Sequence, residues 1–97
     1  MYVVTVEFRV FRGHEAMFLA AVKDQAENSL GREDTCLQFD VSTAPDEDGH
    51  VFLYEVYENE AAFKSHLETA HFHDFNDKTA DWVEAKTVTT WHRVSPN

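Results

Sequence analysis

The sequence predicts a single α+β domain in which helices cover one face of an antiparallel sheet. The chain has 97 residues, the usual length of one domain. Along the chain, the spacing of the apolar residues switches several times between the period of two of a strand and the period of a helix. The few glycines and prolines fall between these periodic segments or near the C-terminal end, where turns and chain ends are expected. We therefore expect residues 1–97 to form one domain without a linker.

The first half of the chain predicts two strands around one long helix. Residues 2–11 are β-branched and aromatic, and alternate residues share a face. Over residues 14–29 the apolar positions recur at helical spacing, and Gly31 is the predicted stop. Residues 35–43 alternate again and lead into a turn at 44–49. This half therefore has the order β-α-β.

The second half predicts a strand, a broken helix and a final strand. The third strand covers residues 51–57. Asn59 is a predicted N-cap for a first helix, and Thr69 for a second one over about 70–82. Residues 84–94 are β-branched and alternate, as in a strand. The complete order is β-α-β-β-α-β, which is the ferredoxin-like arrangement.

Both faces of the third strand are largely apolar. One face carries Val51, Leu53, Glu55 and Tyr57, and the other carries Phe52, Tyr54 and Val56. A strand in an antiparallel sheet with one solvated face would alternate between apolar and polar residues. We therefore expect a second copy of the chain to cover the open face, which gives a homodimeric α/β-barrel.

Charge and cysteine content narrow the classes of partner and compartment. The net charge is −10, from 18 acidic and 8 basic residues. This argues against nucleic acid, whose phosphates need basic residues, and against an anionic membrane surface. No apolar run approaches the ~20 residues of a membrane span, and the N-terminus lacks the pattern of a signal peptide. Cys36 is the single cysteine, so we expect a cytoplasmic protein in a reducing compartment.

Four motifs within residues 36–75 resemble the antibiotic biosynthesis monooxygenase family. They are CLQFDV (36–41), LYEVY (53–57), AAFKSH (61–66) and TAHF (69–72). Members of that family include oxygenases that act on aromatic polyketides and quinols without a cofactor. The family is also similar to an isomerase that degrades phosphorylated autoinducer-2 and to haem-degrading enzymes. This chain has Gln38 and Ala70 where members typically have arginine and proline.

The resemblance implies a homodimeric enzyme that combines a small-molecule substrate with O₂. Our leading hypothesis is a cofactor-independent monooxygenase of a small quinol or hydroxylated aromatic, with a histidine base. The chain has no phosphate-binding glycine motif, so no cofactor is expected. Haem degradation is not expected, because Asn76 occupies the position of the axial histidine of those members. The alternatives are an isomerase of a small carbonyl compound, phosphorylated or not, and a non-catalytic dimeric ligand-binding module.

Two histidines and one glutamate are the candidate catalytic residues. His66 shares a helical stripe with apolar residues, which directs it toward the sheet and favours the neutral, proton-accepting imidazole. His71 begins the next helix, where it could orient a substrate oxygen or act as the base instead. Glu55 is an acid in an apolar strand and needs a partner. Each also has a structural explanation. His66 could be a buried histidine that holds the helix break, His71 could belong to the helix cap, and Glu55 could form a pair at the interface.

Aromatic residues are the candidates for substrate binding. Each of them is also explained by packing in the core or at the interface. The candidates are Tyr57, Phe39, Phe72, Phe75 and Trp91.

No metal site is expected. His73 and Asp77 have the i,i+4 spacing of helical ligands, with His71 and Asp74 nearby. However, no third ligand is assured.

Overall fold

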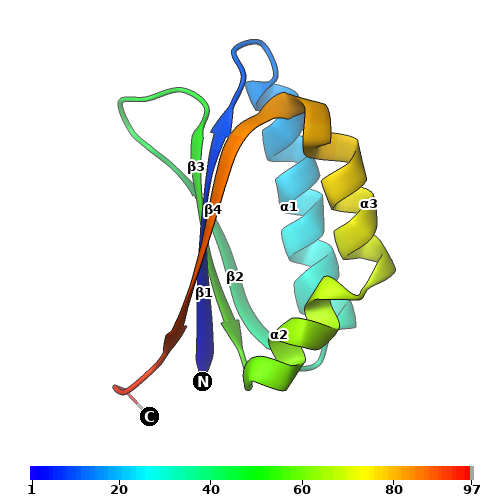
Figure 1. Cartoon of the computed structure of the whole chain (residues 1–97), viewed down its shortest axis with the longest axis vertical. Helices are drawn as coiled ribbons and strands as arrows, with labels where there is room; N and C mark the ends of the chain where they lie inside the picture. The colour runs from blue at the N-terminus through cyan, green and yellow to red at the C-terminus, as the bar shows by residue number, and fades with distance from the viewer. Residues whose placement is uncertain (97) are drawn as a thin grey trace.

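The protein consists of one sheet with all helices on one side (Figure 1). The computed structural model describes residues 1–96. Over this range the elements are β1 (Tyr2–Val10), α1 (Glu15–Arg32), β2 (Cys36–Thr43), β3 (His50–Tyr57), α2 (Glu60–Leu67), α3 (Ala70–Thr79), a 3₁₀ turn η1 (Ala80–Trp82) and β4 (Val83–His92). The predicted ferredoxin-like α+β fold is confirmed, with its second helix divided into α2 and α3.

The sheet has the order β2-β3-β1-β4, and every neighbouring pair is antiparallel. In the register of β1, Val4 lies opposite Glu55 of β3 and Thr90 of β4. Residues that pair directly across strands share a face, so these three side chains point toward the helices. The strand period of two thus sets which residues of β3 and β4 face the helix layer. Glu55 is buried there, whereas Thr90 on the edge strand is exposed.

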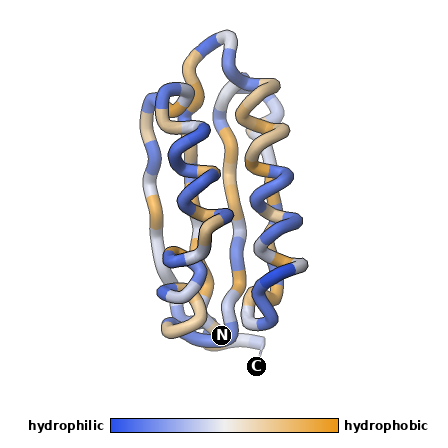
Figure 2. Tube along the Cα trace, turned by 90° about the vertical axis from the view of Figure 1, so that its right-hand side faces the viewer, coloured by the Kyte–Doolittle hydropathy of each residue, from blue (hydrophilic) through white to orange (hydrophobic). Residues whose placement is uncertain are grey.

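The core lies between the sheet and the helices. Phe18 and Val22 of α1 are fully buried against Val4 and Phe8 of β1. Figure 2 views the molecule from the helix side, and hydrophilic and hydrophobic stretches alternate along the helices, as expected for helices with one buried face. Among the described residues, no helix has both the length and the hydropathy needed to cross a membrane.

Two side-chain caps define the break between α2 and α3. Asn59 Oδ1 accepts a hydrogen bond from the Ala62 amide at 2.9 Å, and Thr69 Oγ1 accepts one from the Phe72 amide at 3.2 Å. The Thr69 hydroxyl also donates to the His66 carbonyl at 2.8 Å, which ties the end of α2 to the start of α3. Both helices therefore begin where their caps predict.

Two helix ends differ from the prediction. α1 continues through Gly31 to Arg32, and Glu33 leaves the helix with extended backbone while its amide donates to the Ser29 carbonyl. The helix predicted to run to residue 82 ends at Thr79 and closes with the 3₁₀ turn. Helix ends are weakly determined by local sequence, because several terminal turns satisfy the same carbonyls. The longer α1 places Glu33 beside α2 and α3.

Candidate functional site

A small cavity lies between the sheet and the helices and has a volume of about 210 Å³. Most of its wall is apolar. A cavity of this kind, with few convergent polar groups, is the usual form of a small-molecule site. The residues that line it are Val4, Val6, Phe8, Gln25, Phe39, Leu53, Glu55, Phe63, His66, Leu67, Phe72, Phe75, Lys86 and Val88.

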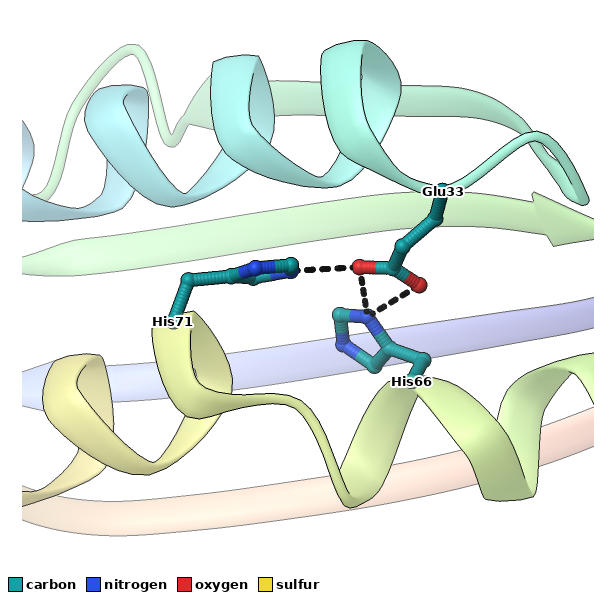
Figure 3. Close-up of side chains that lie close together, drawn as sticks. All are labelled: Glu33, His66 and His71. Atoms are coloured by element: carbon teal, nitrogen blue, oxygen red, sulfur yellow. Dashed lines mark hydrogen bonds and ion pairs between the residues drawn. The ribbon is translucent and has the colours of Figure 1, made fainter.

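His66 lines this cavity from α2 and is oriented by Glu33. Its Nδ1 lies 2.9 Å from Glu33 Oε2 and 3.1 Å from Glu33 Oε1 (Figure 3). A carboxylate oxygen accepts a hydrogen bond, so Nδ1 is the donor and carries the hydrogen. This contact selects the tautomer in which Nε2 has a free lone pair. The nitrogen left for a ligand is therefore a proton acceptor.

Burial lowers the pKa of His66, and the neighbouring Glu33 carboxylate partly opposes that shift. The imidazole is buried among aromatic rings, including those of Tyr57 and Phe72 at centroid distances of 5.2 Å and 5.1 Å. A lowered pKa keeps the ring neutral at physiological pH. A neutral imidazole with a free ring nitrogen can accept a proton.

His71 lies on the other side of Glu33, at the start of α3. Its Nε2 is 2.5 Å from Glu33 Oε2, the oxygen that also accepts from His66 (Figure 3). His71 is not among the residues that line the 210 Å³ cavity. The structure thus brings the two predicted histidines together through Glu33, with one facing the cavity and the other behind it.

Glu33 was not predicted as a site residue. It follows the long helix in the sequence, 33 positions before His66, and no motif surrounds it. The one available signal was an acidic residue two positions after Gly31, the predicted helix stop. The distance of Glu33 from α2 depends on how α1 packs against the other helices. Local sequence patterns do not predict this packing.

Glu55 lines the cavity from β3 and has a partner within the same strand. The Tyr57 hydroxyl donates to Glu55 Oε1 at 2.6 Å, and both side chains are buried. Burial raises the pKa of Glu55 to about 7, and the hydrogen bond from Tyr57 partly opposes this shift. Burial is also the main cause that raises the pKa of Tyr57. Tyr57 itself does not line the cavity, so its hydroxyl supports Glu55 in this arrangement.

Lys86 of β4 is a cation in the cavity wall that the motif analysis missed. Its Nζ lies 5.6 Å from the Phe8 ring centroid and 5.7 Å from that of Phe72. Burial lowers its pKa, while the charge of Glu55 acts in the opposite direction. Lys86 pairs with Phe8 across the sheet, which directs it toward the helices. The alternation of residues along β4 was the sequence signal that could have indicated that Lys86 faces the helices.

The predicted aromatic residues do not all meet at the cavity. Phe39, Phe72 and Phe75 line it. Trp91, which we expected in the same pocket, pairs with Val3 on the opposite face of the sheet. Trp91 is 53% exposed, and its Nε1 donates to Thr5 Oγ1 at 3.1 Å. The prediction is corrected here, because the register of β4 directs Trp91 away from the helices.

Gln25 is a further polar residue that the sequence analysis did not single out. Its side chain is buried on α1 and lines the cavity. Neither its amide nitrogen nor its amide oxygen has a hydrogen-bond partner among the residues that the structure describes. An unpaired buried amide is costly in free energy, so Gln25 favours a polar partner inside this region.

The chain is a ferredoxin-like α+β domain with an apolar cavity between its sheet and its helices. The family model for antibiotic biosynthesis monooxygenases matches residues 1–78, a range that includes Glu33, Glu55, His66 and His71. The chain belongs to the antibiotic biosynthesis monooxygenase family. No curated protein matches this sequence.

Solved structures agree with this assignment. A protein from Nitrosomonas europaea, provisionally named an antibiotic biosynthesis monooxygenase, is 29% identical with a TM-score of 0.91. The alignment covers 97% of this chain and 99% of that one. A protein from Bacteroides thetaiotaomicron with the same provisional name is 25% identical, with a TM-score of 0.91, over 98% of this chain and 90% of that one. A structure from Deinococcus radiodurans shares the fold, with a TM-score of 0.91 and 20% sequence identity. The alignment covers 100% of this chain and 96% of that one.

Proposed function

We propose that this protein is a cofactor-independent monooxygenase that acts on a small quinol or hydroxylated aromatic. The observation on which the proposal rests is His66, held by Glu33 through Nδ1 at the wall of an apolar cavity. Its free Nε2 is suited to remove a phenolic proton. Membership of the antibiotic biosynthesis monooxygenase family supports the same reaction class.

The proposed reaction begins with transfer of the phenolic proton to His66 Nε2. The substrate anion is electron-rich and reduces O₂, and a carbon–oxygen bond forms to give a hydroperoxide. The oxygen–oxygen bond then breaks, and protons lost by the substrate, including the one held by His66, leave with the departing oxygen as water. One oxygen atom remains in the product as a carbonyl. The substrate supplies all four electrons, so the balance needs no separate reductant.

The polar groups of the cavity suit this chemistry. Lys86 provides a positive charge that stabilises a substrate anion in an apolar surrounding. The phenylalanine rings exclude water from the reactive pair. Glu33 is a positioning residue, because it contacts His66 and is absent from the cavity wall. The three groups therefore have separate roles in the proposal.

The volume of the cavity favours a small substrate. An apolar cavity of about 150 Å³ takes up benzene. A cavity of about 210 Å³ therefore suits a single substituted ring better than a fused polyketide. We accordingly propose quinols and hydroxylated single-ring aromatics as the substrate class.

Oxygen uptake by metal-stripped protein is the test of this function. We expect one or more members of a panel of quinols and hydroxylated aromatics to consume O₂ well above their rate of autoxidation, with chelator present. The variant His73→Ala is a suitable active control, because His73 is exposed on α3. Uptake that never exceeds autoxidation with any substrate would contradict the proposal.

An isomerase of a small carbonyl compound is the second candidate. The specific observation in its favour is that Glu55 and His66 line one cavity, and that burial raises the pKa of Glu55 to about 7. Two groups that exchange protons near neutral pH suit a proton shift between adjacent carbons. Turnover under strict anaerobiosis would select this reaction. Tight binding without product in either atmosphere would instead select a non-catalytic binding module.

We also propose that the working form is a homodimer joined through the open face of the sheet. On this face Val3 and Val56 are buried within a single chain, while Phe52 and Trp91 remain partly exposed. Light scattering at micromolar concentration should give about twice the chain mass of 11.2 kDa. Trp91→Asp should shift the mass toward the monomer, and Leu30→Asp on the helix side should not. A monomer mass for the unmodified chain would refute this proposal.

A cytoplasmic location is the last part of the proposal. Cys36 is a free, buried thiol, and burial raises its pKa to about 12. A thiol in that state is a small apolar residue and suits a reducing compartment.

A further inference from the structure

We propose that Glu33, His66 and His71 form a binding site for a divalent transition-metal ion such as Zn²⁺, and that the bound ion switches off the His66 base. The binding part is independent of the proposed oxygenase function. The inhibitory part rests on that function. The two parts are therefore tested by separate measurements.

The donor set fits an ion of this class. Two imidazole nitrogens and one carboxylate oxygen are common Zn²⁺ ligands and also suit other first-row metals. The three side chains are only 3%, 9% and 10% exposed for His66, His71 and Glu33. They come from α2, α3 and the residue that follows α1, so three separate elements converge on one point (Figure 3).

The donor atoms are close to the spacing that a shared ion requires. One donor atom from each residue lies within 4.8 Å of the other two. Ligands bound at about 2.0–2.2 Å in tetrahedral or octahedral geometry are about 3.0–3.6 Å from one another. The Glu33 oxygens lie 2.5–3.1 Å from the two ring nitrogens. A shared ion would require the Glu33–histidine contacts to open by less than about 1 Å, and the three donor atoms, which now lie within 4.8 Å of one another, to reach a common spacing.

The electrostatic setting also favours a cation. In residues 1–96 the ion-pair partners of Glu33 are the two histidines. Neither of these partners has the permanent charge of lysine or arginine, and a metal ion supplies positive charge to this largely buried carboxylate. The Thr69 cap holds the α2–α3 break, so His66 and His71 reach the site from a defined backbone.

Metal binding would reverse the role of the ring nitrogen that faces the cavity. With Nδ1 bound to the ion, the ring hydrogen of neutral His66 moves to Nε2. Nε2 then becomes a donor and can no longer accept the phenolic proton. We therefore infer that an occupied site is inactive in the oxygenase reaction, and that removal of the ion restores the base.

Calorimetric titration of chelator-treated protein with ZnCl₂ alone tests the binding part. We expect one ion per chain, with an affinity that falls at least about tenfold in both His71→Ala and Glu33→Gln. His73→Ala is the matched control, since it removes an exposed histidine from the same helix. Ligand-induced stabilisation should appear as a higher Tm with Zn²⁺ in the unmodified chain.

Co²⁺ provides a second readout that does not depend on these variants. Its visible absorption spectrum distinguishes nitrogen and carboxylate ligation from the hydrated ion. Binding that is equally strong in His71→Ala and the unmodified chain would overturn the site, as would a Co²⁺ spectrum that remains that of the hydrated ion. The three residues would then be a hydrogen-bonded cluster only.

Oxygen uptake in the presence of Zn²⁺ tests the inhibitory part. We expect uptake to fall in proportion to occupancy of the site and to return when chelator is added. Zn²⁺ binding without slower uptake would overturn the switch and leave the metal site in place. A protein that binds Zn²⁺ but oxidises no substrate would instead count against the oxygenase function.

Discussion

His66→Ala should lower kcat/KM for the oxygenated substrate by about 10²–10⁴-fold, the usual contribution of a general base. The reason is that His66 supplies the cavity with a proton acceptor whose tautomer is set by Glu33. Oxygen uptake with the best substrate from the panel is the measurement. Circular dichroism and Tm should accompany it, because His66 is buried and its loss also affects stability.

Neighbouring histidines provide the comparison for this experiment. His71→Ala should have a smaller effect than His66→Ala, because His71 contacts Glu33 from outside the cavity wall. His73→Ala should leave the rate unchanged. If His66→Ala retained activity within about a factor of two, or if His71→Ala were the more damaged variant, His66 would not be the base.

Glu55→Gln should change how the stability of the protein depends on pH. Burial raises the pKa of Glu55 in the folded protein to about 7, from an ordinary value of 4.5. Between these values the folded state binds more protons than the unfolded state, so the free energy of unfolding falls as the pH rises. The loss of stability from ionising the buried Glu55 carboxyl is fully present above about pH 7 and absent below about pH 4. Glutamine, which does not ionise, avoids it.

The expected size of this effect is about 3 kcal/mol. It is the amount by which the free energy of unfolding of Glu55→Gln, relative to that of the unmodified chain, increases between about pH 4 and pH 8. Urea denaturation at both pH values is the measurement. Exposed Glu27→Gln on α1 is the control and should show no comparable change. A Glu55→Gln variant that lost relative stability at the higher pH would indicate that the carboxylate is ionised and paired with Lys86.

The secondary structure was largely predictable because its signals are local. The alternating apolar residues of β1 and β3 and the capping side chains of Asn59 and Thr69 lie within the elements that they define. The inward direction of Glu55 follows from the same alternation. The errors were at element ends: α1 passed Gly31, α3 closed with a 3₁₀ turn, and β4 ended at His92 instead of residue 94.

The site was predicted only in part, because its partners are far apart in sequence. His66, Glu55 and the three phenylalanines were candidates from their own surroundings, and the structure brings them to one cavity. Glu33 was missed because it meets His66 only when α1 packs beside α2. Trp91 was misplaced because an aromatic residue in a strand gives no sign of its face until the register with Val3 is known.

The sequence by itself therefore determined the order of the elements, the α+β class and the family motifs. The tertiary structure decided which tautomer of His66 faces the cavity, which face of β4 carries Lys86 and which carries Trp91, and that two histidines share one carboxylate. The physical reason is the range of the interactions. Periodicity and capping act over a few residues, whereas strand register and the contacts of Glu33 join residues more than 30 positions apart.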